Sequence, residues 1–123
     1  MDNVLEKYIL DSENPILNYE MGLSYQNNGD HSSAVSFYIR CKERTDNTLL
    51  QYECILRCAE CFRYRGKSDW VIKGLLESAI NLEPRRPEAY FLISRFHCWR
   101  AEWENGYGYA SVGIENLNDE SLH

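Results

Sequence analysis

Apolar residues recur along most of the chain at the spacing of one face of an α-helix, and small or turn-forming residues interrupt this pattern at regular intervals. The pattern predicts three pairs of antiparallel helices joined by short turns. The first helix of each pair is expected near 15–28, 48–65 and 87–100, and the second near 31–44, 69–83 and 103–116.

A further apolar pattern precedes the first pair. Val4, Leu5, Tyr8 and Ile9 stand at i, i+1, i+4 and i+5, which predicts a short amphipathic helix over 2–11 that caps the first hairpin. The same stretch is equally compatible with the remnant of a preceding hairpin.

The three helix pairs align with one another as an internal repeat. The anchors Gly22, Ala59 and Ser94 are all small, and each is followed by a ring and then by a small or turn-forming residue at fixed distances. A helix hairpin of this kind cannot bury its apolar face alone, so the copies must stack. The aligned positions are Tyr25, Phe62 and His97; Gly29, Gly66 and Ala101; Ala34, Ile72 and Gly106; Tyr38, Leu76 and Ala110; and Cys41, Ala79 and Gly113.

The repeat resembles the tetratricopeptide repeat (TPR) family. The anchors are 37 and 35 residues apart, which a unit of about 34 residues explains with insertions near 43–47 and 67–69. The motif reads Met21-Gly22-x-x-Tyr25-x-x-x-Gly29-Asp30, then Ala34, Tyr38 and Cys41, and the third copy reads Glu88-Ala89-Tyr90 through Trp103 to Ala110. Asn18 and Ile72 depart from it, because the family places a large apolar residue and Ala there.

The resemblance implies an all-α, TPR-like helix-hairpin solenoid of three antiparallel helix pairs plus the short N-terminal helix. A length of 123 residues with 44% hydrophobic content suits one domain with a continuous core. The expected repeats span about 15–48, 49–86 and 87–116 of a single domain over 1–123, with a tail at 117–123.

Composition and charge narrow the classes of function. The longest apolar runs fall far short of the roughly 20 residues of a membrane helix, and the N-terminus lacks the pattern of a secretory signal. A cytoplasmic location without membrane contact is therefore expected. The net charge of -6 argues against a dedicated nucleic-acid binder, although residues 31–100 carry twelve bases against eight acids.

The five cysteines are an odd number, which a disulfide-stapled secreted fold would not use. Cys54, Cys58 and Cys61 share one helical stripe. A zinc or redox site on Cys58-x-x-Cys61 is the alternative, but no second Cys pair stands at finger spacing. We interpret the thiols as small packing residues and expect no metal and no cofactor.

The sequence offers no constellation for catalysis. G-x-S-x-G, Walker and G-x-G-x-x-G loops are all absent. His97 occupies the repeated aromatic position and is interpreted as a core ring. The chain is therefore predicted not to be an enzyme, because function must be argued from a site.

The concave surface of the first helices is the predicted binding groove for a peptide or protein partner. It mixes aromatics with Arg, the residue types that dominate binding hot spots. The alternative is a solvated face whose charges only form i,i+3 and i,i+4 pairs. The groove residues are Tyr19, Leu23, Gln26 and Asn27 from the first copy, Arg57, Glu60, Arg63 and Tyr64 from the second, and Phe91, Arg95 and Trp99 from the third.

Two more specific functions were weighed. In the TPR subclass that clamps chaperone C-termini, Lys and Asn hold the carboxylate, and only Arg57 matches here, so that ligand is not expected. The third copy also resembles TPR-like stretches attached to glycosyltransferases, in Arg86-Pro87-Glu88-Ala89-Tyr90, Ser94-Arg95-Phe96 and Gly108-Tyr109-Ala110. That resemblance implies an accessory module that positions an acceptor or partner without catalysis of its own.

The last hairpin is expected to mediate self-association. An array of stacked hairpins usually covers its final helix with an extra polar-faced one, whereas residues 116–123 are too few for a separate stable helix. The resulting apolar patch would carry Tyr107, Ile114 and Leu117. We predict a two-fold homodimer through this hairpin.

Overall fold

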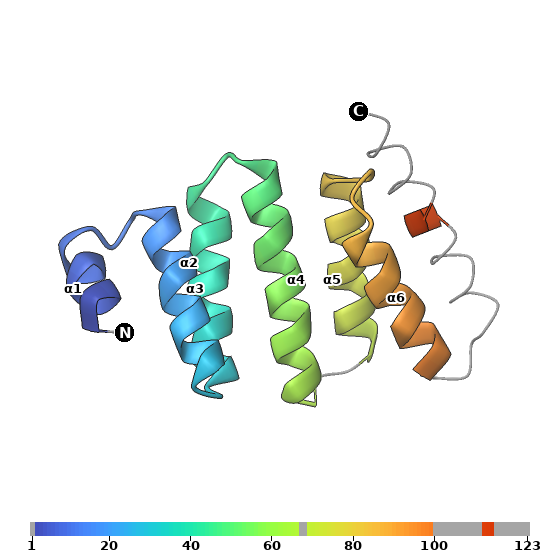
Figure 1. The fold of residues 1–123 in the computed structure, drawn as a ribbon, viewed down its shortest axis with the longest axis horizontal. Helices are drawn as coiled ribbons and strands as arrows, with labels where there is room; N and C mark the ends of the chain where they lie inside the picture. The colour runs from blue at the N-terminus through green and yellow to red at the C-terminus, as the bar shows by residue number, and fades with distance from the viewer. Residues whose placement is uncertain (1, 67–68, 100–111, 115–123) are drawn as a thin grey trace. The chain divides into compact units, whose positions relative to one another are not determined.

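The computed structural model describes residues 2–66, 69–99 and 112–114, and its described residues are helical with short turns and contain no strand. Figure 1 shows the helices in chain order. They are Asp2–Leu10 (α1), Pro15–Asn27 (α2), His31–Arg44 (α3), Thr48–Tyr64 (α4), Asp69–Leu82 (α5) and Glu88–Trp99 (α6). Each lies within a residue or two of its predicted range. The last predicted helix, 103–116, is described only at 112–114, which are helical.

Local side-chain chemistry sets the helix ends. Asn14, Asp30 and Asn47 precede α2, α3 and α4, and their side chains accept hydrogen bonds of 2.9–3.2 Å from N–H groups of the first turn. Those N–H groups have no partner within the helix, so the caps define where each helix starts. Gly29 and Gly66 follow α2 and α4 with φ of 82° and 69°, a conformation that glycine adopts without steric cost.

The chain divides into two compact units, residues 1–68 and residues 69–123. The first contains α1 to α4, and the second contains α5, α6 and the helical residues 112–114. The single domain expected over 1–123 stays a prediction. None of the described helices combines the length and the apolar character that crossing a membrane requires.

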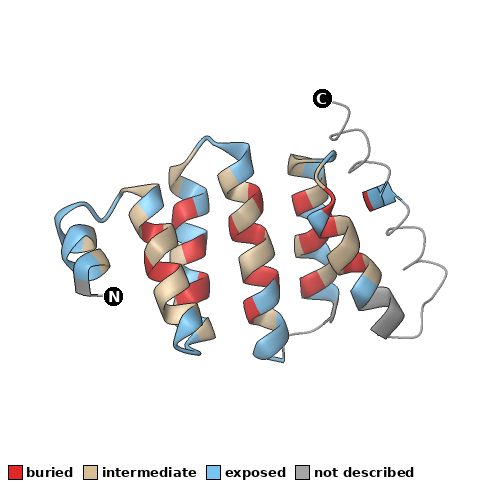
Figure 2. Cartoon of the chain, in the orientation of Figure 1, coloured by how far each residue is buried: buried red, intermediate tan, exposed pale blue. Residues whose placement is uncertain are grey.

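In the first unit α2 packs on α3, and α3 packs on α4. The backbones of α2 and α3 approach closely at Gly22, where a Cβ would lie 2.6 Å from Cε1 of Tyr38. Ala34, Tyr38 and Cys41 are fully buried in α3, and Figure 2 shows buried positions along α2, α3 and α4. Gly22, Ala34, Tyr38 and Cys41 all occupy positions that recur in the sequence repeat. The repeat therefore marks the residues at which α2 and α3 pack in this unit.

In the second unit α5 packs on α6. Leu76 and Ala79 are buried in α5, and Ala89 and Ile93 are buried in α6. Gly113 approaches α6 so closely that a Cβ there would lie 3.1 Å from the ring of Phe91. The first helix of the third hairpin, α6, thus packs on α5 and lies close to Gly113.

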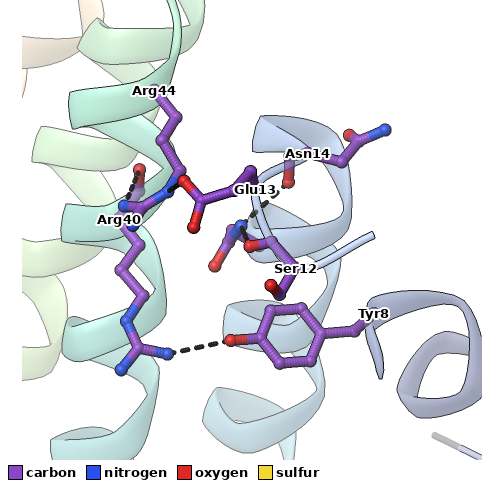
Figure 3. A network of polar contacts seen from close by, with 7 residues as sticks. Tyr8, Ser12, Glu13, Asn14, Arg40 and Arg44 are labelled. Atoms are coloured by element: carbon purple, nitrogen blue, oxygen red, sulfur yellow. Dashed lines mark hydrogen bonds and ion pairs between the residues drawn. The ribbon is translucent and has the colours of Figure 1, made fainter. Parts of the chain in front are cut away.

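The predicted N-terminal helix α1 is present and packs on the first hairpin. The Tyr8 ring meets the Phe37 ring edge-on at 5.4 Å. Tyr25 stacks on Phe37 at 5.4 Å, and the Arg40 guanidinium lies 5.2 Å from the Phe37 ring centre. Arg40 Nη1 also donates a 3.0 Å hydrogen bond to the Tyr8 hydroxyl (Figure 3). One aromatic ring of α3 therefore gathers contacts from α1, α2 and its own helix.

The turn between α1 and α2 is held by a second group of contacts, also drawn in Figure 3. Asn18 is fully buried, and its Nδ2 donates to the carbonyl oxygens of Ser12 and Asn14 at 2.9 Å each. Arg44 Nε donates to Glu13 Oε2 at 2.6 Å. Asn18 departs from the family pattern because it satisfies two carbonyls of this turn, which an apolar side chain could not do.

Candidate functional site

A polar cluster joins α2 and α4 at the surface of the first unit. The Tyr19 hydroxyl on α2 donates to Glu53 Oε1 on α4 at 3.3 Å. One turn further along α4, Arg57 Nε donates to the same oxygen at 3.2 Å. The side chains of Arg57 and Glu53 remain 35% and 41% exposed. The predicted groove residues Tyr19 and Arg57 are thus brought together, with Glu53 between them.

A third helix reaches this cluster through Tyr38 of α3. Its ring is buried and lies 5.6 Å from the Tyr19 ring. Its hydroxyl donates to Gln26 Oε1 at 2.5 Å. That hydrogen bond orients the Gln26 amide, so the NH₂ group, which carries two donors, faces away from Tyr38. We refer to Tyr19, Gln26, Tyr38, Glu53 and Arg57 as the Tyr19–Arg57 cluster.

The electrostatics of the cluster keep its phenols neutral and its guanidinium charged. Burial raises the pKa of Tyr19, and the negative charge of Glu53 adds to the shift. Burial also raises the pKa of Tyr38 well above its usual value. For Arg57, burial lowers the pKa, but Tyr19, Tyr38 and Glu53 together outweigh it and the net pKa rises. At neutral pH the cluster therefore offers one cation, one carboxylate and neutral hydrogen-bonding groups.

This set of groups suits reversible recognition. Arg57 carries five N–H donors in a planar fork, of which Nε–H is directed at Glu53. The two phenols stay protonated, so neither acts as a base near neutral pH. Among the residues that the structure describes, no three His, Cys, Asp or Glu side chains gather into a group that could hold a metal ion.

The predicted groove residues at the C-terminal end of α4 have a different environment. Arg63 and Tyr64 are both exposed, and the Arg63 guanidinium lies 5.4 Å from the centre of the Tyr64 ring. The Tyr64 ring stacks on His31 of α3 at 4.8 Å, with 4° between the planes. Glu60 is exposed on the preceding turn of α4. One face of the Tyr64 ring is thus covered by His31 of α3, and Tyr64 as a whole remains 61% exposed.

The remaining predicted groove residues differ in their exposure. On α2, Leu23 is half-buried and Asn27 is exposed. In the second unit, Arg95 is exposed, whereas Phe91 is half-buried and its ring lies against Gly113. The side chain of Trp99 lies outside the described residues, as do Tyr107 and Leu117 of the predicted dimer surface. Ile114 of that surface is 52% exposed.

The cysteines of the first unit form part of its core. Cys41, Cys54, Cys58 and Cys61 are all free thiols and all buried. Burial raises the pKa of Cys58 to about 12 and that of Cys61 to about 11. A hydrogen bond with Cys41, together with burial, raises the pKa of Cys54. All four thiols thus lie in the packed core of the first unit, and the expectation that they bind no metal stays a prediction from sequence.

Two members of this surface were not predicted from the sequence. Tyr38 was assigned to the core from its place in the repeat, and its ring does lie there, but its hydroxyl reaches Gln26 at the surface. His31, the first residue of α3, stacks on the Tyr64 ring. For Tyr38, the sequence did offer an indication, because a Tyr carries a hydroxyl that seeks a hydrogen-bond partner even when its ring is buried. No pattern in the sequence indicates that the rings of His31 and Tyr64, 33 positions apart, would be in contact.

The chain was compared with known proteins. No protein-family model matches it, and no curated protein matches it. Solved structures do match. One described as "Crystal structure of MamA protein" gives a TM-score of 0.79 at 13% identity, covering 99% of this chain and 64% of that chain. Another, "MamA MSR-1 C2", gives 0.73 at 14% identity, covering 95% and 65%.

A third solved structure, "Crystal structure of MamA", gives a TM-score of 0.52 at 12% identity, covering 98% of this chain and 88% of that chain. This chain spans less than two thirds of the length of the first two structures. At these identities the likeness carries information on the fold alone. The fold is all-α and TPR-like, built from helix hairpins.

Proposed function

We propose that this protein is a non-catalytic interaction scaffold that binds a peptide or protein segment across α2 and α4. The observation that carries the proposal is the Tyr19–Arg57 cluster, in which Tyr19 and Arg57 meet at Glu53. Fixed, half-exposed Tyr and Arg side chains are the groups that most often dominate binding energy. Their order before binding reduces the entropy that a partner must overcome.

The cluster presents donors for the carbonyl or carboxylate oxygens of a bound segment. Arg57 and the oriented amide of Gln26 supply N–H groups, and Glu53 supplies a matching acceptor. Exposed Asn27 and Tyr64 extend the surface beyond the cluster along α2 and α4. A TPR-like fold supports this role in general terms, because repeat arrays offer extended binding surfaces.

The proposal concerns this chain and not the longer proteins that it resembles in fold. The accessory role beside a glycosyltransferase stays a prediction from sequence. Of the residues that suggested it, Gly108, Tyr109 and Ala110 lie outside the described residues.

Selection from a random peptide display library on the purified chain tests the proposal. Wild-type protein should enrich related peptides. Arg57→Ala should reduce their affinity by about tenfold or more, as expected for a hot-spot side chain. Arg65→Ala is the matched control, because it removes the same charge from the exposed residue just beyond α4.

Circular dichroism of each variant checks that the helices are retained. Enriched peptides that bind wild type and Arg57→Ala equally would show that the cluster is not the binding surface. Failure of wild type to enrich any related peptides over several rounds would contradict peptide recognition by this chain.

A further inference from the structure

The apolar stripe of α1 is wider than the face that the helix buries. In the sequence the stripe consists of Val4, Leu5, Tyr8 and Ile9. In the structure Val4 and Tyr8 are half-buried, and Tyr8 contacts Phe37. Leu5 and Ile9 stand one position further around the helix and are 38% and 68% exposed. Figure 2 shows the exposed side of α1.

A third apolar residue extends this exposed face. Leu10, the last residue of α1, is 89% exposed. With 3.6 residues per turn, Glu6 projects between Ile9 and Leu10, and it too is exposed. We call Leu5, Glu6, Ile9 and Leu10 the outer face of α1. A cluster of large apolar side chains on a surface is the usual mark of an interaction site.

The outer face is held in position, since α1 is anchored at several points. Tyr8 accepts a hydrogen bond from Arg40. The backbone N–H of Asp11 donates to the carbonyls of Lys7 and Tyr8 at 3.1 Å and so closes the last turn of α1. The turn that follows is tied to α3 through Glu13 and Arg44. A partner would therefore meet a preformed surface.

We propose that the outer face of α1 docks an amphipathic helix of a partner protein that carries Lys or Arg beside its apolar stripe. A helix fits because Leu5 and Ile9 are spaced i and i+4, the spacing of ridges that interlock with a second helix. The basic character follows from charge complementarity. Glu6 is the charged residue within the face, and exposed Asp11 directly follows Leu10.

This charge also disfavours two other occupants. Anionic lipid surfaces attract basic, not acidic, segments. The face of a second copy, docked by two-fold symmetry, would bring Glu6 toward its own symmetry mate, and like charges at an interface oppose association. The proposal is independent of the Tyr19–Arg57 cluster, which lies on other helices.

The test uses a synthetic helical peptide of about four turns, built from Leu, Ala and Lys, with a fluorescent label. Binding to the full chain is followed by anisotropy at low salt. A second peptide, in which Glu replaces every Lys, is the matched probe. We expect the Lys peptide to bind at least about tenfold more tightly than the Glu peptide.

Two variants locate the site. Leu5→Gln combined with Ile9→Gln should weaken binding of the Lys peptide by about tenfold or more, because it removes the apolar contact. Ile39→Gln is the control, since Ile39 is exposed on α3 to a comparable extent, 43%, and this change should leave binding unaltered. Glu6→Lys should weaken the Lys peptide and strengthen the Glu peptide, which gives a second readout if the double variant unfolds.

Three results would overturn the proposal. Equal affinity for the two peptides would show that the charge of the partner helix does not contribute to binding. Binding that survives both the Leu5/Ile9 variant and Glu6→Lys would place the peptide elsewhere. Concentration-dependent mass in sedimentation, lost on Ile9→Gln, would assign the face to a second copy of this chain.

Discussion

The Tyr19 hydroxyl donates a hydrogen bond to Glu53 Oε1 at 3.3 Å, between residues 34 positions apart. Tyr19 lies on α2 and Glu53 on α4, so the bond joins the first helices of two successive hairpins. The neighbouring ion pair between Glu53 and Arg57 lies within one helix, and such exposed i,i+4 pairs contribute only about 0.3–0.5 kcal/mol. The hydrogen bond from Tyr19 connects this ion pair of α4 to a second helix, α2.

A double-mutant cycle on Tyr19→Phe and Glu53→Ala should reveal this coupling. We expect a coupling energy of about 0.5–1.5 kcal/mol in urea unfolding, the usual size of a partly buried hydrogen bond. Tyr25→Phe with Glu53→Ala is the control cycle, because Tyr25 stacks on Phe37. Coupling of equal size in both cycles would mean that the Tyr19 bond adds nothing specific.

Gly22→Ala should destabilise the first unit. The new Cβ would lie 2.6 Å from Cε1 of the buried Tyr38 ring, and overpacking of this kind costs about 1–3 kcal/mol. Gly74→Ala is the matched substitution, because Gly74 lies within α5 with no heavy atom within 4 Å of the new Cβ. It should stabilise its helix by up to about 1 kcal/mol. Urea unfolding followed by circular dichroism measures both, and a Gly22→Ala protein as stable as wild type would contradict the close packing.

The stability of the fold should fall as the pH rises above about 8.5, where thiols of the unfolded chain ionise. In the folded chain the pKa of Cys61 is raised to about 11 and that of Cys58 to about 12. The folded thiols therefore keep protons that the unfolded chain releases. Replacing both with Ala should flatten the dependence of the urea midpoint on pH. An unchanged slope in the variant would assign the effect to other groups.

Whether the three thiols of α4 bind a metal ion can be tested directly. The Cys54, Cys58 and Cys61 side chains are buried packing groups, so changing all three to Ala should leave the helices intact. Stoichiometric zinc in the wild-type protein, measured by atomic emission, would show that the thiols bind metal.

Asn18→Ala should loosen the turn between α1 and α2. It would leave the Ser12 carbonyl without its 2.9 Å donor and the Asn14 carbonyl with only the Asn18 backbone N–H, and loss of a hydrogen bond of this kind costs about 0.5–1.5 kcal/mol. Faster trypsin cleavage after Lys7 is the expected sign of local opening. Asn27→Ala removes the same amide from an exposed position of α2 and should leave the rate unchanged. Equal rates in both variants would show that Asn18 does not hold the turn.

The predicted homodimer can be tested at Ile114, which is 52% exposed. Sedimentation equilibrium at micromolar concentration should give a mass that rises with protein concentration. Ile114→Glu should shift the chain toward monomer, because it places a charge in an apolar contact. A wild-type mass that stays at the monomer value would contradict self-association through this hairpin.

Helix positions followed from the sequence because their causes are local. The capping side chains of Asn14, Asp30 and Asn47 and the glycines after α2 and α4 act within a few residues of each helix end. The contacts of the candidate site depend instead on how helices are rotated against one another, which periodicity does not specify. Helical spacing alone placed Tyr19 and Arg57 on one predicted surface, but it did not indicate that both would bind the same oxygen of Glu53.

The outer face of α1 illustrates the same limit. The sequence predicted one apolar stripe, and only the structure divides it into a half that contacts Phe37 and a half that remains exposed. Asn18 was recognised as a departure from the repeat, but its partners are backbone carbonyls, which every residue carries.

The close approach of Gly22 and Tyr38 has a consequence for how the repeats differ. The ring occupies the volume that a side chain on Gly22 would need, so the two positions share a fixed amount of space. At the aligned positions the other copies hold Ala59 with Leu76 and Ser94 with Ala110. As the first residue grows from Gly to Ala to Ser, the second shrinks from Tyr to Leu to Ala. In the first copy, therefore, a larger residue at position 22 would require a smaller one at position 38, and a pair such as Ala with Leu is the exchange to expect there.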